Sequence, residues 1–342
     1  MDDLELSSGS EIQVTQARNR FRGSAELRWG LEPLNKPEPP TTQPTNTIKN
    51  ATNTVQLLLW HQLPAWQQEG NHFIETGYRP GAESFWQCLH SLTYFHNESV
   101  NIYSHAFGAI LFAVIPLYVF NTEIPPRYIV ATTADKIVLS IYFIGVAICF
   151  VFSVWFHTFF HHSPDTFSLL QKFDFTGVIV LMWGANVPLI YYGFICDPKL
   201  QVAYWFMTTS LALLCSVITF KPQFSDPHLR PFRAATFGCL ALSTFIPVSH
   251  GLVKYGYETH SQRIGLRWIL LTLLFNSLGA AAYASKFPEK WYPRQFDMVG
   301  ASHQLFHIFI VCAGVMYGRA VLQEFDFLHS SAPSVCQGRS EH

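Results

Sequence analysis

The stretch ASHQLFHIFIVCAGVMYG, residues 301–318, is an uncharged apolar run with two histidines at its beginning. His303 and His307 are four residues apart, so on a helix both imidazoles lie on one face. The run is close to the about 20 residues that a helix needs to cross a membrane. The stretch therefore predicts a membrane-spanning helix that carries half of a metal site at one end.

Six further apolar runs precede this one, separated by loops with turn signals, and hardly any Lys, Arg, Asp or Glu lies inside them. A backbone surrounded by lipid must satisfy its own hydrogen bonds, so runs of this length form helices. The sequence thus predicts an all-α fold, a seven-transmembrane helix bundle in which Pro116, Pro188 and Pro247 produce kinks rather than breaks. The predicted helices are 101–120, 137–160, 174–195, 201–220, 233–253, 265–285 and 301–320.

The composition agrees with a membrane protein and argues against a nucleic-acid partner. The 342 residues are 49% hydrophobic and 13% charged, whereas soluble domains have about 25% charged residues. A formal net charge of -1 lacks the basic surplus of a nucleic-acid-binding protein. The seven cysteines occur singly, without CxxC pairs, so we expect small buried hydrophobes and no disulfide framework.

The first hundred residues differ from the rest of the chain. Residues 1–55 are polar and Pro-rich and begin without the features of a secretory signal peptide, which predicts a disordered tail. Residues 56–100 are predicted to lie at the membrane interface, with a small soluble cap packed under the helices as an equal alternative. The helix bundle is assigned to 101–325 and a short C-terminal tail to 326–342. The aromatic residues that suit the interface are Trp60, Trp66, Trp86 and Tyr94.

Helix parity gathers polar residues at one face of the membrane. Successive membrane-crossing helices alternate in direction, so helices 1, 3 and 7 begin on the same face of the membrane and helix 2 ends on that face. Helix 5 also begins there and ends on the opposite face, where His250 lies. The residues gathered in this way are Glu98, Asn101, His105, Ser153, His157, His161, Asp174, His303 and His307. Ionisable groups at membrane depth are expensive and persist mainly where they pair or bind something.

Three imidazoles and a nearby carboxylate match the pattern of a catalytic zinc, which has three protein ligands and a fourth position for water. His157 would join His303 and His307 as ligands. Zinc lowers the pKa of its bound water to about 7. Asp174 would hold that water or act as general base, and Ser153, one turn before His157, would hydrogen-bond the water or a developing oxyanion.

Each residue also has a structural interpretation. Histidines at a membrane interface, such as His161, His162 and His250, are more often headgroup or helix–helix contacts. Ser153 can bond to a carbonyl of its own helix, and Asp174 can be a first-turn charge favoured by the helix dipole. An ordinary polar helix entrance explains three more residues equally well: Glu98, Asn101 and His105.

Long, widely spaced motifs carry a family resemblance. They are HNESVNIYSH at 96–105, SVWFHTFFHHSP at 153–164, KFDFTG at 172–177 and FPEKWYPRQFDMVGASHQLFH at 287–307, with LPAWQQEGNHFIETGYRP at 63–80. The chain resembles the adiponectin receptor and progestin receptor family, also called the haemolysin III superfamily, and in detail its fungal branch. The match runs from about residue 57 to residue 325.

The resemblance implies a seven-helix protein of the plasma membrane or an endomembrane, with a cytosolic N-terminus and a zinc ion near the cytosolic side. It implies His157, His303 and His307 as the ligands, and Asp174 and Ser153 as residues around the zinc-bound water. Lys and Arg near the helices are divided evenly between the two sides, so the charge distribution does not determine the orientation.

Three functions agree with these expectations. The first is a zinc-dependent hydrolase acting on a membrane lipid amide of the ceramide type, with a role in lipid and zinc homeostasis. The second is a receptor in which zinc is structural and an extracellular ligand shifts the bundle. The third is a membrane-bound enzyme of a fungal pathway, such as a terpene cyclase.

Overall fold

The computed structural model describes residues 55–68, 70–121, 127–221, 229–330 and 336. Over these residues the chain is all-α, without named strands. The predicted tail, residues 1–55, lies outside them except for its last residue. Seven helical segments are long and apolar enough to cross a membrane, which confirms the predicted bundle.

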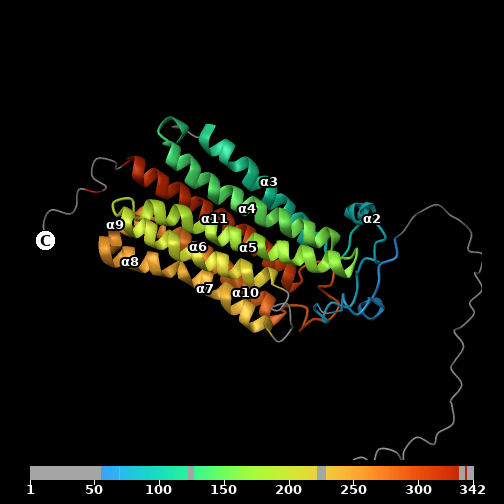
Figure 1. Cartoon of the computed structure of the whole chain (residues 1–342). Helices are drawn as coiled ribbons and strands as arrows, with labels where there is room; N and C mark the ends of the chain where they lie inside the picture. Colours follow the sequence, from blue (N-terminus) through green and yellow to red (C-terminus); the bar gives the residue numbers. More distant parts are fainter. Residues whose placement is uncertain (1–54, 69, 122–126, 222–228, 331–335, 337–342) are drawn as a thin grey trace, which may run out of the picture. The chain divides into compact units, whose positions relative to one another are not determined.

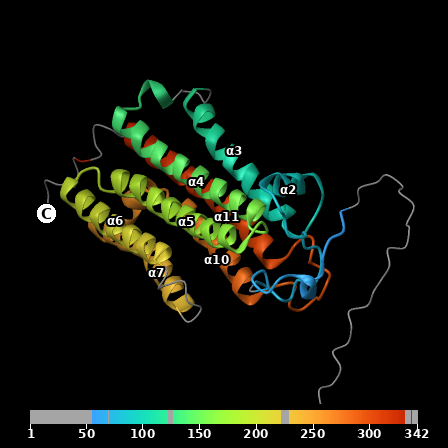
Figure 2. The same cartoon turned by 45° about the vertical axis from the view of Figure 1, so that its right-hand side comes forward.

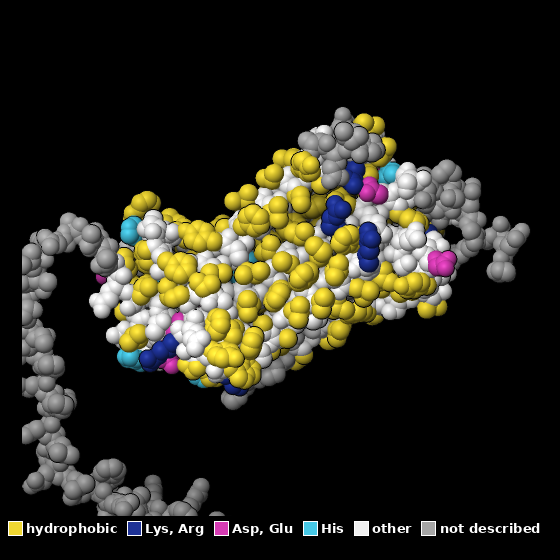
Figure 3. Space-filling model, turned by 180° about the vertical axis from the view of Figure 1, so that it is seen from behind, with side chains coloured by type: hydrophobic (Ala, Val, Ile, Leu, Met, Phe, Trp, Pro, Cys, Tyr) yellow, Lys and Arg dark blue, Asp and Glu magenta, His cyan; other side chains and the backbone are white. Residues whose placement is uncertain are grey.

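The spans lie side by side in two views (Figures 1 and 2). They are α3 (Ser99–Asn121), α4 (Thr133–Phe159), α5 (Pro164–Gly193), α6 (Pro198–Phe220), α7 (Arg230–Ser243) continued by α8 (Phe245–Tyr255), α10 (Leu266–Ser285) and α11 (Ser302–Ser330). Shorter helices are η1 (Trp60–Gln62), α2 (Phe85–His90), η2 (Ser91–Thr93), η3 (Arg127–Ile129) and α9 (Tyr257–Arg263). Hydrophobic side chains cover much of the flank (Figure 3), as contact with lipid requires.

The third span begins ten residues earlier than predicted. Ser163 is its N-cap and accepts a hydrogen bond from the backbone N–H of Thr166, and Pro164 is its first residue, a position that suits proline. The first-turn acid is Asp165. Asp174 lies about 14 Å beyond Asp165 along the helix axis, so its interpretation as a first-turn charge is wrong.

Two prolines lie inside continuous helices, as predicted, and the third accompanies an interruption. Pro116 is inside α3 and Pro188 inside α5. The fifth span is divided into α7 and α8 at Thr244, three residues before Pro247. Proline has no N–H to donate to the carbonyl one turn earlier, and its ring crowds that carbonyl.

The core of the bundle lies between α3, α4, α5 and α11. Phe112, Tyr142, Phe150, Tyr192 and Val321 are buried there in one cluster. The hydroxyl of Tyr142 donates to the carbonyl of Gly314 at 2.7 Å. These contacts hold α4 against α11, the two helices that carry the predicted histidines.

Glycines allow α4 and α5 to approach closely. A Cβ atom added at Gly177 would lie 2.8 Å from the Cα of Cys149, and one added at Gly184 would lie 3.1 Å from the carbonyl oxygen of Ile141. A side chain at Gly177 would force the two helices to shift, and one at Gly184 would make an unusually tight contact with the backbone of α4. The glycines therefore determine how closely Asp174 on α5 approaches the residues of α4.

One pair of cysteines corrects the expectation of isolated buried thiols. Cys196, after α5, forms a disulfide with Cys336, 140 residues away and after α11. Of the five free cysteines, Cys88, Cys149 and Cys215 are buried as expected. Single cysteines this far apart show no pairing pattern in the sequence, because only the packing of the helices brings them together.

Residues 55–98 pack against the end of the bundle that carries the predicted histidines. Arg79 donates to the carbonyls of His157 at 2.6 Å and Thr158 at 3.2 Å. The Asp297 carboxylate, in the loop before α11, accepts from the backbone N–H of Thr76 at 2.8 Å. These contacts pack the segment against the ends of α4 and α11, while Trp86 on α2 remains 76% exposed.

Candidate metal centre

Three histidines from two helices converge at one end of the bundle. His157 lies in the last turn of α4, and His303 and His307 lie in the first two turns of α11. The Nε2 atom of His303 is 3.3 Å from that of His157 and 3.1 Å from that of His307. The three side chains offer ligand atoms that all lie within 4.8 Å of one another. The cluster can therefore hold a metal ion.

The opposite ring nitrogens of two of these histidines face acceptors. The Nδ1 atom of His157 lies 2.7 Å from Oε2 of Glu98, and the Nδ1 atom of His307 lies 3.2 Å from the carbonyl oxygen of Asn101. Each acceptor favours the imidazole tautomer that carries its proton on Nδ1. The lone pair on Nε2 then faces the space between the three histidines. Metal-ligating histidines are oriented in this way.

Glu98 is a functional candidate that the sequence interpretation left as an ordinary helix entrance. Its Oε2 atom also accepts from the side-chain amide of Asn101 at 2.6 Å. Burial raises the pKa of this carboxyl, but His157, this hydrogen bond and His303 outweigh burial and hold the pKa below its usual range. Glu98 is thus an anion beside the histidines. The three-residue spacing of Glu98 and Asn101, which places both side chains on one face of a helix, is the sequence feature that could have indicated this candidate.

Asp174 and Ser153 lie beside the histidines, as parity predicts. The Asp174 carboxylate interacts electrostatically with His157 and is close to the side chain of Ser153. Ser153 is buried, whereas Asp174 and His303 keep part of their surface exposed. Asp174 is not part of the group of side chains whose ligand atoms lie within 4.8 Å of one another.

The remaining histidines of the predicted set do not join the ligand group. His161 is buried, and its carbonyl accepts from the backbone N–H of Ala82 at 3.2 Å. His162 stacks on Phe85 with ring centroids 4.3 Å apart. His250 contacts the hydroxyl of Tyr204 through Nδ1 at 2.5 Å. His162 and His250 thus contact neighbouring helices, whereas the Nδ1 atom of the buried His161 has no hydrogen-bond partner among the described residues.

Helix parity placed His105 on this face of the membrane, but the sequence did not predict its contact with a candidate ligand. Its ring stacks on that of His307, with centroids 3.8 Å apart and planes inclined by 12°. Neither ring nitrogen of His105 has a hydrogen-bond partner among the described residues. The ring therefore supports one face of a candidate ligand.

Arg79 and Gln304 fix the backbone around the histidines. Besides its bonds to two carbonyls of α4, Arg79 donates to the hydroxyl of Ser91 at 2.8 Å, and burial lowers its pKa to about 10. Arg79 thus remains charged at neutral pH. The amide of Gln304, between the two histidines of α11, donates to the carbonyls of Asn97 at 2.8 Å and Met298 at 3.1 Å.

Comparison with known proteins agrees with this architecture. Residues 93–317 match the family model described as haemolysin III-related. The chain is 37% identical over 258 residues to the adiponectin receptor protein of Drosophila melanogaster, a match that covers 75% of this chain and 57% of that protein, less than two thirds of its length.

Relatives from other organisms match over more of their length. The chain is 34% identical over 289 residues to the ADIPOR-like receptor IZH2 of Saccharomyces cerevisiae, covering 84% of this chain and 90% of the relative. It is 28% identical over 277 residues to heptahelical transmembrane protein 1 of Arabidopsis thaliana, with 80% and 82% covered. The chain therefore belongs to the haemolysin III-related family and is a multi-pass integral membrane protein, similar to adiponectin receptor and ADIPOR-like receptor proteins, fungal ones included.

Proposed function

We propose that the protein is a zinc-dependent hydrolase that cleaves the amide of a ceramide-like membrane lipid. The observation that carries the proposal is the spacing of the Nε2 atoms of His157, His303 and His307, 3.1 and 3.3 Å. Two nitrogens about 2.0–2.1 Å from a tetrahedral zinc ion are about 3.3–3.4 Å apart. The donor set, three imidazoles with a carboxylate nearby, is also one that zinc prefers.

Bound zinc would supply an acidic water and a Lewis acid for the amide carbonyl. Asp174 accepts a proton from the attacking water and later donates it to the departing amine nitrogen, so that the amide is replaced by a carboxylic acid and a free amine. Ser153 donates a hydrogen bond to the oxygen on which negative charge develops. Glu98 and the Asn101 carbonyl keep the imidazoles of His157 and His307 oriented.

The depth of the site supports a lipid substrate. His157 and His303 lie in the terminal turns of membrane-spanning helices, and Asp174 lies further inside α5. A molecule that places its amide there must be amphiphilic, with apolar chains in the bilayer and the amide near the headgroup level. In α10, next to α11, only Gly279 is buried, so most side chains of this helix are available for contact with the surrounding lipid.

The disulfide supports a cytosolic N-terminus and a metal centre at the cytosolic face. Cys196 follows α5 at the end opposite to the histidines, and Cys336 follows α11 at that same opposite end. Disulfides persist in oxidising compartments, outside the cell or in the lumen of the secretory pathway. A membrane-impermeant maleimide should label these cysteines in intact cells only after reduction. For protein located at the plasma membrane, labelling only after permeabilisation of the cells would reverse the orientation.

The test of function uses purified protein in detergent, with ceramide as substrate. We expect about one zinc ion per chain by elemental analysis and release of a free fatty acid and a sphingoid base. His307→Ala should lose the zinc. Asp174→Asn should keep it and lose at least about 100-fold in rate, because general acid–base catalysis contributes about 10²–10⁴-fold. The control is His90→Ala, an exposed histidine outside the bundle.

The outcomes separate this proposal from a receptor with structural zinc, which the receptor names of the relatives favour. Stoichiometric zinc without lipid hydrolysis would leave the receptor as the better proposal. Protein without zinc, or His307→Ala with undiminished zinc, would contradict both.

A further inference from the structure

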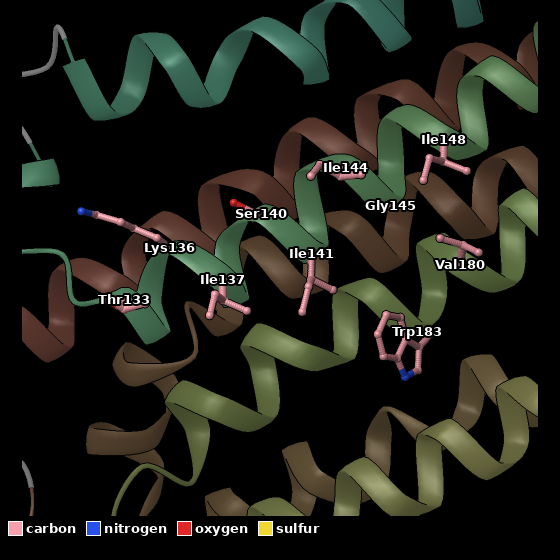
Figure 4. A pocket seen from close by; sticks show the side chains of 10 residues that line it. All are labelled: Thr133, Lys136, Ile137, Ser140, Ile141, Ile144, Gly145, Ile148, Val180 and Trp183. Carbon is pink, nitrogen blue, oxygen red and sulfur yellow. The ribbon is translucent and has the colours of Figure 1, made fainter.

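A groove on the membrane-facing flank lies outside the metal centre. It has a volume of about 480 Å³ and runs between α4 and α5, bordered by residues of α4 from Thr133 to Ile148 and by Val180 and Trp183 of α5. Figure 4 shows Lys136 near one end of this row and Ile148 at the other. The volume falls within the about 300–1,000 Å³ of known small-molecule sites.

Small residues between large ones create the hollow. Ser140 and Gly145 border it among isoleucines, of which Ile137 and Ile144 are 55% and 57% exposed. Gly145 packs tightly against α5, because a Cβ atom added there would lie 3.3 Å from the carbonyl oxygen of Val180, closer than most Cβ contacts. The close packing of α4 on α5 thus forms the floor of the groove.

The lining changes from polar to apolar with depth. Thr133 and Lys136 lie in the first turn of α4, where the helix enters the membrane on the face opposite to the histidines, whereas Ile144, Ile148 and Val180 lie deeper. Lys136 and Ile148 are twelve residues apart, about 18 Å along the helix. One leaflet of the hydrocarbon core is about 15 Å thick. The groove therefore spans a single leaflet.

The charge at the mouth of the groove has no counter-charge among the described residues. Lys136 is exposed and forms no ion pair with them. The neighbouring Asp135 is buried on the other side of α4, where it accepts from the hydroxyl of Tyr192 at 2.9 Å and contacts His329 at 3.0 Å. An anionic group at the level of the headgroups would complement Lys136.

We propose that the groove binds one phospholipid of that leaflet, with an acyl chain along Ile144 and Ile148 and its phosphate at Lys136. The apolar depth requires a hydrocarbon chain, and the lysine at the headgroup level requires an anion on the same molecule. A phospholipid combines the two at the required separation. This site is separate from the histidines and needs no zinc.

The test compares two lipids with the same acyl chains, phosphatidic acid and diacylglycerol, which differ only in the phosphate. Binding to the intact protein in detergent is measured by native mass spectrometry. We expect phosphatidic acid to bind at least about 5-fold more tightly than diacylglycerol. Lys136→Gln should remove that difference, because a basic residue near a membrane surface contributes about 1 kcal/mol toward an anionic lipid, or about 5-fold.

A second set of variants tests the groove itself. Ser140→Trp fills it from an exposed position and should weaken phosphatidic acid binding at least about 10-fold. The controls are Val202→Trp, on the exposed flank of α6, and Lys199→Gln, an exposed lysine on the same side of the membrane. Both controls should bind like the unmodified protein.

Three results would overturn the proposal. They are equal binding of the two lipids, unchanged binding to Ser140→Trp, and an equal loss of binding in the controls. Displacement of phosphatidic acid by an uncharged sterol at equal concentration would assign the groove to a sterol instead.

Discussion

At the scale of single residues, the metal centre depends on partners that hold the imidazoles. Glu98 contacts Nδ1 of His157, the Asn101 carbonyl contacts Nδ1 of His307, and the ring of His105 stacks on that of His307. Such outer contacts determine tautomer and ring orientation. Residues outside the ligand set therefore control whether the three Nε2 atoms of the histidines face one another and can bind the same metal ion.

Glu98→Gln should weaken zinc binding about 10–100-fold, the usual effect of losing an outer partner of a ligand. The amide still fits the space, but it lacks the negative charge that supports a positive metal centre. Competition with a chelator of known affinity measures the change. Glu258→Gln, at an exposed carboxylate on α9, is the matched control. Equal zinc affinity of Glu98→Gln and the unmodified protein would show that Glu98 does not support His157.

At the scale of elements, the contact of α4 with α5 determines where Asp174 stands. Gly177 lies three residues after Asp174, and the residue it touches, Cys149, lies four residues before Ser153. Each pair is about one helical turn apart. The glycine contact and the pairing of Asp174 with Ser153 are thus parts of one interface.

Gly177→Ala should move α5 away from α4 and lower lipid hydrolysis while zinc remains bound. The added methyl would lie 2.8 Å from the Cα of Cys149, a backbone atom that cannot give way alone. Overpacking of this kind costs about 1–3 kcal/mol. The measurements are turnover, zinc content and thermal midpoint. Gly238→Ala, where nothing lies within 4 Å of the added atom, should leave all three unchanged, and an equally active Gly177→Ala would contradict the argument.

At the scale of the whole molecule, the two ends of the bundle are stabilised differently. At one end the segment 55–98 packs over the histidines through Arg79, and at the other a disulfide joins Cys196 to Cys336. In the same end region, Lys254 forms an ion pair with Asp197 at 3.2 Å. A change at the disulfide end should leave the metal centre intact.

Replacing both Cys196 and Cys336 by serine should lower the thermal midpoint without changing zinc content. A disulfide restricts the unfolded chain and stabilises a protein by about 2–4 kcal/mol. Thermal unfolding in detergent, with and without a reducing agent, measures the effect. The reducing agent should destabilise the unmodified protein and Cys239→Ser, which alters an exposed free cysteine, but should not affect the double variant. Equal midpoints throughout would show that the disulfide does not stabilise the fold.

The sequence by itself determined the all-α bundle and the side on which the polar residues gather. A backbone in lipid must satisfy its own hydrogen bonds, so each membrane-crossing segment is a helix. Its contact with lipid makes the segment recognisable in the sequence as an apolar run. The four-residue spacing of His303 and His307 and the parity of the helices then brought His157 and Asp174 to the same face. These inferences need only local periodicity and the order of the helices.

Only the tertiary structure decided the contacts between distant segments. The bonds of Arg79 to the end of α4, the contact of Glu98 with His157 and the Cys196–Cys336 disulfide join residues 59 to 140 positions apart. The true start of α5 also escaped prediction, because its first turns are polar. Such features depend on how helices pack and on which side chains face each other, and neither leaves a periodic pattern in the chain.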